Sequence, residues 1–268
     1  ALINANKAFE VRQDLYWVIE SAFNLRAKAG DWEGALQVLN SGHKKKLVPD
    51  DKYKYLKAVT LYQLAENAKQ SGDSVNFFKY CSQANEYNPE LVPAALALAE
   101  YYVQNDNQIR NAANVLSRIW RRNPTGEIAE AYLNLWSDDS AAERVQRMES
   151  LALTNSKRPS LNNLLLAVFD AKAKFWNKAR SEFEIFLINN PATKRIAKVI
   201  YEYEKHFHKN EAAAQSWKNK TASCADDSVW VCSECGHVSK KWRPVCDKCS
   251  AIGEYKWHLY VEKSAKDD

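Results

Sequence analysis

Six cysteines are the residues of this sequence with the clearest capacity for chemistry, and four of them fall into two close pairs. Cys232 and Cys235 form one Cys-x-x-Cys pair, Cys246 and Cys249 form the other, and ten residues separate the pairs. Each pair lets two thiolates face one ion from a tight turn, and Gly236 suits a turn that needs positive φ. Four thiolates close a tetrahedral site without leaving a position for substrate, which predicts a structural Zn²⁺.

The same four thiols admit two other uses. They could form two disulfides, although close pairs in an otherwise thiol-poor chain favour metal in a reducing compartment. A rubredoxin-like iron site has the same ligands, but rubredoxins place more residues between the pairs, and ligand geometry and metal availability favour zinc. His237 and His258 could compete as ligands, but four cysteines already fill the tetrahedron. We therefore expect both imidazoles at the surface.

Three tryptophans recur around the cysteine pairs, at Trp230, Trp242 and Trp257. A unit of about 30 residues has little core of its own. Large aromatic side chains supply most of the burial that such a unit can find. We expect the tryptophans to shield the metal or to dock this small unit onto the last helical hairpin.

A short basic cluster suggests a different use of the cysteine unit, as a ribbon that binds nucleic acid. The cluster consists of Lys240, Lys241, Trp242 and Arg243. The whole chain carries a formal net charge of +5, with a pI near 8.7, and Lys and Arg alternate with Asp and Glu along most of it. A nucleic-acid-binding domain is usually more basic, with its cations in one stripe. The composition admits an acidic partner and argues against nucleic acid.

The rest of the chain must position the cysteines, and its composition predicts helices. Only seven glycines and seven prolines occur, too few for many short strands and tight turns. Gly30, Gly72 and Gly126 fall at breaks between helix-like segments. No run of about 18 apolar residues occurs, so we expect no membrane span. The sequence opens at Ala1 without a signal peptide, and we expect it to be a trimmed piece of a longer protein.

The segment before and after Gly72 predicts one antiparallel helical hairpin. Leu61, Leu64, Ala65 and Ala68 share one helical face before the glycine, and a second helical pattern runs from there to Pro89. A Gly-Asp turn between two such patterns, with a proline after the second, is typical of paired helices.

The same layout returns along the chain, and the residue that opens the second helix of each copy marks the repeat. These residues are Ala35, Phe77, Ala112, Ala179 and Ala213. From Phe77 onward they are spaced by about 34 residues or twice that, which is the tetratricopeptide period. A degenerate copy, from Ile128 to about Thr154, fills the longer interval.

This pattern resembles the tetratricopeptide repeat, with a small residue in each helix, an aromatic after the turn and a closing proline. The resemblance covers about residues 14–218. Phe77 departs from it, because the family usually has alanine there, and the first connection, around 42–51, is longer than normal.

We therefore predict an all-α fold, a tetratricopeptide-type α-solenoid with a small C-terminal four-cysteine knuckle of the zinc-ribbon or rubredoxin type. The expected parts are a repeat domain (1–217), a polar linker (218–228), the knuckle (229–262) and a polar tail (263–268). Cys81 is expected at a core position of a helix and Cys224 in the linker, both as free thiols.

Stacked hairpins form a superhelix whose concave groove binds peptides or protein segments. The sequence shows no nucleophile–base pair and no phosphate-binding loop, so we predict a non-catalytic scaffold that binds protein partners. Polar residues off the apolar stripes of the first helices are the candidate groove positions: Asn67, Glu100, Gln104, Asn134 and Asn163.

Three features together resemble the HemY family of bacterial tetratricopeptide proteins. They are the hairpin opening from Gly30 to Leu36, the repeat from Trp176 to Ala179, and the terminal block. That block contains Trp230, Val231, Cys232, Cys235, Gly236, Trp242, Cys246, Cys249 and Trp257. The resemblance extends over essentially the whole chain, and the terminal block is its most specific part.

Members of the HemY family carry N-terminal transmembrane helices before a cytoplasmic repeat domain and are linked by name to late haem biosynthesis. The resemblance thus implies a soluble fragment of an inner-membrane protein whose partners are membrane-associated enzymes. It does not imply protoporphyrinogen oxidation, because no flavin-binding Gly-rich loop is present. LapB-type adaptors, which regulate lipopolysaccharide synthesis at the inner membrane, have a similar layout; the Trp-x-Cys opening and Trp242 favour HemY.

Overall fold

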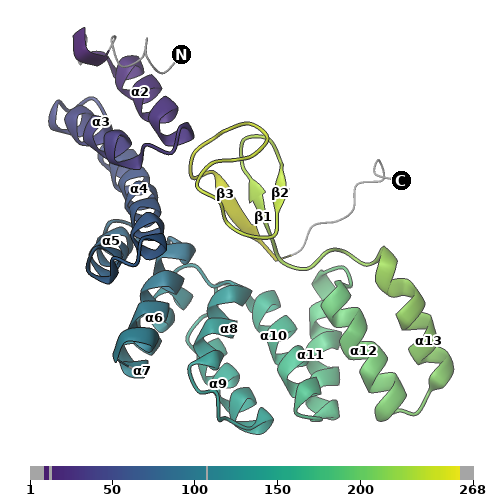
Figure 1. The fold of residues 1–268 in the computed structure, drawn as a ribbon. Coiled ribbons are helices and arrows are strands. Elements are labelled where there is room, and N and C mark those ends of the chain that lie inside the picture. The colour runs from purple at the N-terminus through teal and green to yellow at the C-terminus, as the bar shows by residue number, and fades with distance from the viewer. Residues whose placement is uncertain (1–8, 12–13, 107, 260–268) are drawn as a thin grey trace. The chain divides into compact units, whose positions relative to one another are not determined.

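The computed structural model of the chain describes residues 9–11, 14–106 and 108–259. Helices dominate it, and three short strands lie near its C-terminal end (Figure 1), as the sequence predicts. The helices are α2 (Tyr16–Lys28), α3 (Trp32–Lys44), α4 (Asp50–Gln70), α5 (Ser74–Tyr87), α6 (Val92–Asp106), α7 (Ile109–Trp120), α8 (Gly126–Asn134), α9 (Ala141–Leu153), α10 (Pro159–Lys172), α11 (Trp176–Asn189), α12 (Lys194–His206), α13 (Glu211–Lys220) and the 3₁₀ turn η1 (Thr221–Ser223). The strands β1 (Val229–Cys232), β2 (Val238–Ser239) and β3 (Tyr255–His258) form one sheet in the order β2-β1-β3.

The chain folds as two compact units. Unit 1 contains the described residues of 1–115 together with 231–256, and unit 2 contains the described residues of 116–230 and 257–268. Unit 1 therefore combines the first hairpins with all four paired cysteines, which are distant from them in sequence.

Side-chain caps explain where several of the helices begin. The Asp31 carboxylate accepts the Gly34 N–H at the start of α3 (2.9 Å), and Asp73 accepts the Asn76 N–H at the start of α5 (3.0 Å). Such caps satisfy N–H groups that have no partner within the helix. The corresponding caps of α8, α9, α12 and α13 are Thr125, Ser140, Thr193 and Asn210.

The second helices of the hairpins share one register, which corrects one residue of the predicted repeat. In each, the backbone N–H of an early residue bonds to the carbonyl of the residue four places before it, just ahead of the helix. The residues in this position are Ala35, Phe77, Ala112, Arg144, Ala179 and Ala214. The expected Ala213 is wrong by one position: Ala214 is fully buried, whereas Ala213 is partly exposed. The degenerate copy is present as α8 and α9, with Arg144 in place of a small residue.

The core of unit 1 comes from α2, α3 and α4 and includes a residue of the knuckle. Phe23, Leu39 and Val59 are each at most 2% exposed, and Ile252 belongs to the same cluster of buried side chains. No single hairpin encloses this cluster, so stacking of helices from successive hairpins is what removes it from water.

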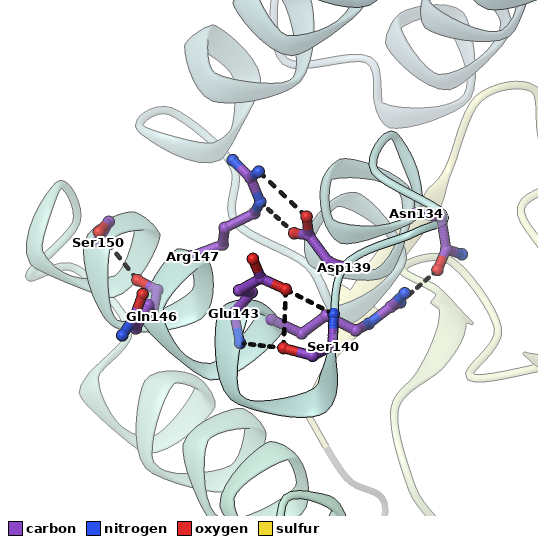
Figure 2. A network of polar contacts seen from close by, with 8 residues as sticks. Asn134, Asp139, Ser140, Glu143, Gln146, Arg147 and Ser150 are labelled. Carbon is purple, nitrogen blue, oxygen red and sulfur yellow. Dashed lines mark hydrogen bonds and ion pairs between the residues drawn. The ribbon is translucent and has the colours of Figure 1, made fainter.

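The turn between α8 and α9 is held by polar contacts (Figure 2). Ser140 and Glu143 form a reciprocal capping box at the start of α9. Arg147 pairs with Asp139 and also lies over the Trp136 ring, 3.8 Å from its centroid. These contacts replace the Gly-Asp turn that precedes α3 and α5, which explains why the repeat is hard to recognise here.

The expected linker at 218–228 is ordered by bonds to the start of α12. Its first residues continue α13 to Lys220 and then form η1. The Ala225 carbonyl accepts the Lys194 N–H (3.1 Å), and the Asp227 carboxylate accepts the Arg195 N–H (3.0 Å). The polar residues of this segment therefore bond to the start of α12, and the segment is not a flexible linker.

No helix among the described residues is long and apolar enough to cross a membrane.

Unit 2 buries one carboxyl group without full hydrogen bonding. Asp170 of α10 is 2% exposed, and its Oδ1 has no hydrogen-bond partner among the described residues. Burial raises the pKa of Asp170 to about 6, while Lys178 opposes the rise and Glu149 and Glu182 add to it. The charged form is therefore poorly accommodated at neutral pH.

We expect Asp170→Asn to stabilise the protein at neutral pH. The folded-state pKa lies above the unfolded value, so the folded state holds the proton more tightly. Its stability is then highest below about pH 4 and falls by about 2–3 kcal/mol as the pH rises to about 6. Urea unfolding at pH 4 and pH 7 should show a gain for the variant only at the higher pH.

Asp138→Asn is the matched control for this measurement, because Asp138 is exposed in the same unit. Its stability should change little at either pH. Equal effects of the two variants would contradict the assignment of the pH dependence to Asp170.

Candidate metal centre and interaction groove

Two similar turns carry the paired cysteines. In the first, the Gly236 N–H donates to the Cys232 carbonyl (2.9 Å), with Gly236 at φ +71°. In the second, the Ser250 N–H donates to the Cys246 carbonyl (2.8 Å), with Ser250 at φ +61°. Both turns thus need a left-handed residue directly after the second cysteine, and glycine marks only the first of them.

The four sulfur atoms lie at the spacing that a tetrahedral metal ion requires. The Sγ atoms of Cys232 and Cys249 are 3.7 Å apart, as are those of Cys235 and Cys246. All four lie within 4.8 Å of one another. A zinc–sulfur bond of about 2.3 Å implies about 3.8 Å between ligands at tetrahedral angles, whereas a disulfide needs about 2 Å. The residues therefore fit a bound metal, and the six cysteines are free thiols.

The surroundings of Cys246 favour its ionised form. Burial opposes ionisation, but the backbone N–H groups of Cys249 and Lys248 and the Tyr255 hydroxyl lower the pKa of Cys246 to about 6. The Tyr255 oxygen lies 3.6 Å from the Cys246 sulfur. At Cys232, by contrast, burial raises the thiol pKa. A cation that binds all four sulfurs would supply the charge that keeps them deprotonated.

The other candidate ligands lie outside this cluster. Among the described residues, the histidines and carboxylates add no member to the four cysteines. His258 is exposed, as expected, and His237 is partly exposed. Cys81 is buried on α5, where burial raises its thiol pKa to about 12, and the buried Cys224 lies 3.3 Å from the Lys220 carbonyl. Neither of these thiols is placed for metal binding.

In unit 1 the knuckle packs against α4, a contact that the sequence does not predict, and in unit 2 Leu259 packs against the buried cluster that α12 contributes to, near the last hairpin as expected. The Trp242 ring lies edge-on to Tyr62, with 5.6 Å between ring centroids. Trp242 therefore provides packing, and its neighbour Arg243 pairs with Asp247 (3.0 Å). The basic cluster proposed for nucleic acid is thus partly used inside the protein.

Gly253 sets how closely the knuckle approaches α4. Its carbonyl accepts a hydrogen bond from the Tyr55 hydroxyl, and its φ is +73°. A Cβ atom at this position would lie 2.8 Å from the Tyr55 ring and 3.2 Å from Val59. Only glycine satisfies both the backbone conformation and this contact.

The other two tryptophans of the knuckle belong to unit 2 and are buried, whereas Trp242 is partly buried. The Trp230 indole N–H donates to Glu127 of α8 (3.0 Å). The Arg158 guanidinium, just before α10, lies 4.9 Å from the Trp257 ring centroid.

The candidate groove residues all lie on first helices of hairpins, but their side chains make different contacts. Asn67 and Gln104 are exposed, and Glu100 bonds to Lys69 of α4 and to Gln104. In unit 2, Asn134 accepts a bond from Arg144 of α9 (Figure 2), and Asn163 donates to Glu182 of α11. These two bond to the second helix of their own hairpin. Partner binding by the set remains a prediction.

Unit 2 contains a groove that was not predicted from the sequence. It has a volume of about 850 Å³. Its lining comes from α8, α10, α12 and the start of α11: Glu130, Val168, Ala171, Lys172, Lys174, Trp176, Arg195, Lys198, Val199, Glu202 and His206. The α12 residues recur at helical spacing along one face. This spacing is the only feature of the sequence that could have indicated the groove, and an ordinary solvated helix face has the same spacing.

We expect the purified chain to carry about one zinc ion, because four thiolates at this spacing form a closed tetrahedral site. Native mass spectrometry and elemental analysis measure its identity and stoichiometry. Cys246→Ser should lose the metal, and the control Cys81→Ser/Cys224→Ser should keep it. Protein with two disulfides and no metal, or with iron as its native metal, would contradict the zinc assignment.

We expect Gly253→Ala to destabilise unit 1 by about 2–4 kcal/mol, because it combines left-handed strain with a steric overlap. Hydrogen exchange should quicken in the knuckle and in α4 around Tyr55, and metal removal by a chelator should have the same effect.

Gly236→Ala is the matched control for docking, because Gly236 has a similar φ but no atom within 4 Å of an added Cβ. It should cost about 1 kcal/mol and leave α4 protected. Unchanged exchange in α4 after Gly253→Ala and after chelation would show that the docking does not support the helices.

No protein-family model matches this chain. Among curated proteins, it is similar to the probable magnetosome protein Mms48 of Magnetospirillum gryphiswaldense, with 22% identity over 255 residues and 94% of this chain covered. The chain spans about half the length of that relative (54%). The similarity thus includes both the helical hairpins and most of the knuckle.

Proposed function

We propose that this chain is a non-catalytic scaffold that holds segments of partner proteins. The groove on α10 and α12 is the observation that carries this proposal, because its 850 Å³ volume suits an extended or helical segment. Helical hairpins in register commonly use such a face for binding. The apolar side chains Val168, Val199 and Trp176 line it beside charged ones, which is the composition of a recognition surface.

In this proposal the knuckle has a structural role, with Cys232, Cys235, Cys246 and Cys249 holding zinc. A site closed by four sulfurs offers no open position to a substrate. When bound, the ion would supply the cross-link that so small a unit needs in place of a larger core. The protein's own part is to hold the two turns against α4 through Ile252, Gly253 and Trp242.

The biological context of the scaffold rests on resemblance. Resemblance to HemY supports membrane-associated enzymes of late haem biosynthesis as partners, at the cytoplasmic side of the bacterial inner membrane, with the anchor outside this chain. A LapB-like role in lipopolysaccharide synthesis is the alternative with the same layout. Similarity to a probable magnetosome protein supports a third setting, in a bacterial assembly of that kind.

Site-specific photo-crosslinking in cells tests the scaffold proposal. A photoreactive residue at Val168 or Lys198 of the groove should give discrete protein adducts. The same residue at Ile188 on α11, which is 75% exposed, is the control and should give few. A third position, Val238 in the knuckle (45% exposed), tests whether the knuckle is the working surface instead. Adducts only at Val238, or equally at Ile188, would contradict groove binding.

A further inference from the structure

We infer that the groove of unit 2 binds an acidic protein segment that carries a large apolar side chain. This inference rests on the proposed scaffold function and names the chemistry of the partner.

One of the two carboxylates that line the groove is paired with a cation of the protein. Glu130 pairs with Arg195 (3.1 Å), and Arg195 also lies 3.9 Å from Asp227. Glu202 bonds to His206 along α12 (3.0 Å), a contact that neutralises the carboxylate only when the imidazole carries a proton. The lining holds four fixed cations against these two carboxylates, and one of the four, Arg195, is already paired.

Three lysines are those remaining cations. Lys172, Lys174 and Lys198 are exposed, and in the part of the chain that the structure describes none of them pairs with a carboxylate. Lys172 lies at the end of α10, 5.1 Å from the centroid of the Phe169 ring. Like charges that line one concave surface attract an opposite charge more strongly than scattered ones do. The groove therefore complements a ligand with several carboxylates.

An apolar surface accompanies this charge. Val168, Ala171 and Val199 line the groove beside Trp176, whose ring stacks on His206 with 6.4 Å between centroids. A smaller hollow of about 350 Å³ continues past Trp176. It is lined in part by Phe175 and Phe207, which are 38% and 46% exposed. Exposed aromatic side chains beside a groove provide anchor positions for an apolar side chain of a ligand.

Protein fits this surface better than nucleic acid does. Glu130 and Glu202 line the groove along with the lysines, and a continuous phosphate backbone would pass close to both carboxylates. A peptide can place its acidic side chains opposite the lysines and a neutral residue opposite the carboxylates. The mixed charge of the lining thus favours a segment with separated charges.

Selection from a displayed library of random short peptides tests the inference on the intact, metal-loaded chain. Acidic sequences with an aromatic or aliphatic residue should be enriched. Their affinity, measured by fluorescence anisotropy, should fall about tenfold or more in Lys172→Glu/Lys198→Glu and should weaken with added salt. Lys172→Gln/Lys198→Gln should give a smaller loss, which guards against a folding defect of the charge reversal.

Arg121→Glu/Lys157→Glu is the matched control, because both residues are exposed in unit 2 and lie outside the groove lining. It should change affinity by less than about twofold, as distant surface changes do. Trp176→Ala should weaken peptides that carry the apolar residue more than peptides that lack it.

The possible results distinguish a failure of this inference from a failure of the proposed scaffold function. The inference would be overturned if neutral or basic peptides were enriched and bound equally well to the Lys172→Glu/Lys198→Glu variant. In that case, protein adducts from a photoreactive residue at Lys198 would still support the scaffold function. Tighter binding of single-stranded oligothymidylate than of any selected peptide would replace the acidic segment by nucleic acid. Absence of both groove crosslinks and groove-dependent peptides would end both proposals.

Discussion

A two-helix hairpin has an apolar face that it cannot cover alone, and this constraint governs the organisation of the chain. Within each unit, helices of successive hairpins cover one another's faces, as α3 does with α4 and α9 with α10. The knuckle is subject to the same constraint in a stronger form, because about 30 residues enclose almost no core. It meets the constraint by adding Ile252 to the buried cluster of α2, α3 and α4.

Docking links the metal centre to the helices of unit 1. The turn that follows Cys249 leads within a few residues to Gly253, whose carbonyl accepts the Tyr55 hydroxyl. The position of Gly253 depends on the turn that Cys246 and Cys249 form, and a metal ion bound by the four sulfurs would hold that turn in place. Metal binding is therefore expected to contribute to the stability of the repeats as well as to that of the knuckle.

Charge is distributed differently on surfaces within the hairpins and on the surface of the unit 2 groove. At the α8–α9 turn and within hairpins, cations meet carboxylates at short range, as Arg147 meets Asp139. In the α10–α12 groove lysine and arginine outnumber the carboxylates, and three of the lysines lack a carboxylate partner among the described residues, so the surface keeps a net positive charge. Surface ion pairs contribute little to stability. Their arrangement matters more for what each surface attracts.

The sequence by itself determined the features that depend on short spacings. Cys-x-x-Cys pairs bring two sulfurs together through a local turn, and caps such as Asp31 and Asp73 begin helices through bonds to nearby N–H groups. Helical periodicity gave the buried face of each hairpin, and from it the solenoid. Asn155 shows the limit of local reasoning: it is polar and 4% exposed, and no periodic signal marks it as buried.

Tertiary structure decided everything that depends on a distant neighbour. Tyr55 and Gly253 are separated by 198 residues, and only the shapes of the two surfaces bring them together, so the sequence could not predict that the knuckle contacts α4. Polar helix positions are equivalent until their neighbours are known. Asn134 and Asn163, predicted as groove positions, also bond to the second helices of their own hairpins, and Lys172 and Lys198, which no sequence pattern singles out, line one groove. Periodicity identifies which face of a helix is apolar, and packing decides which of its polar faces meets a partner.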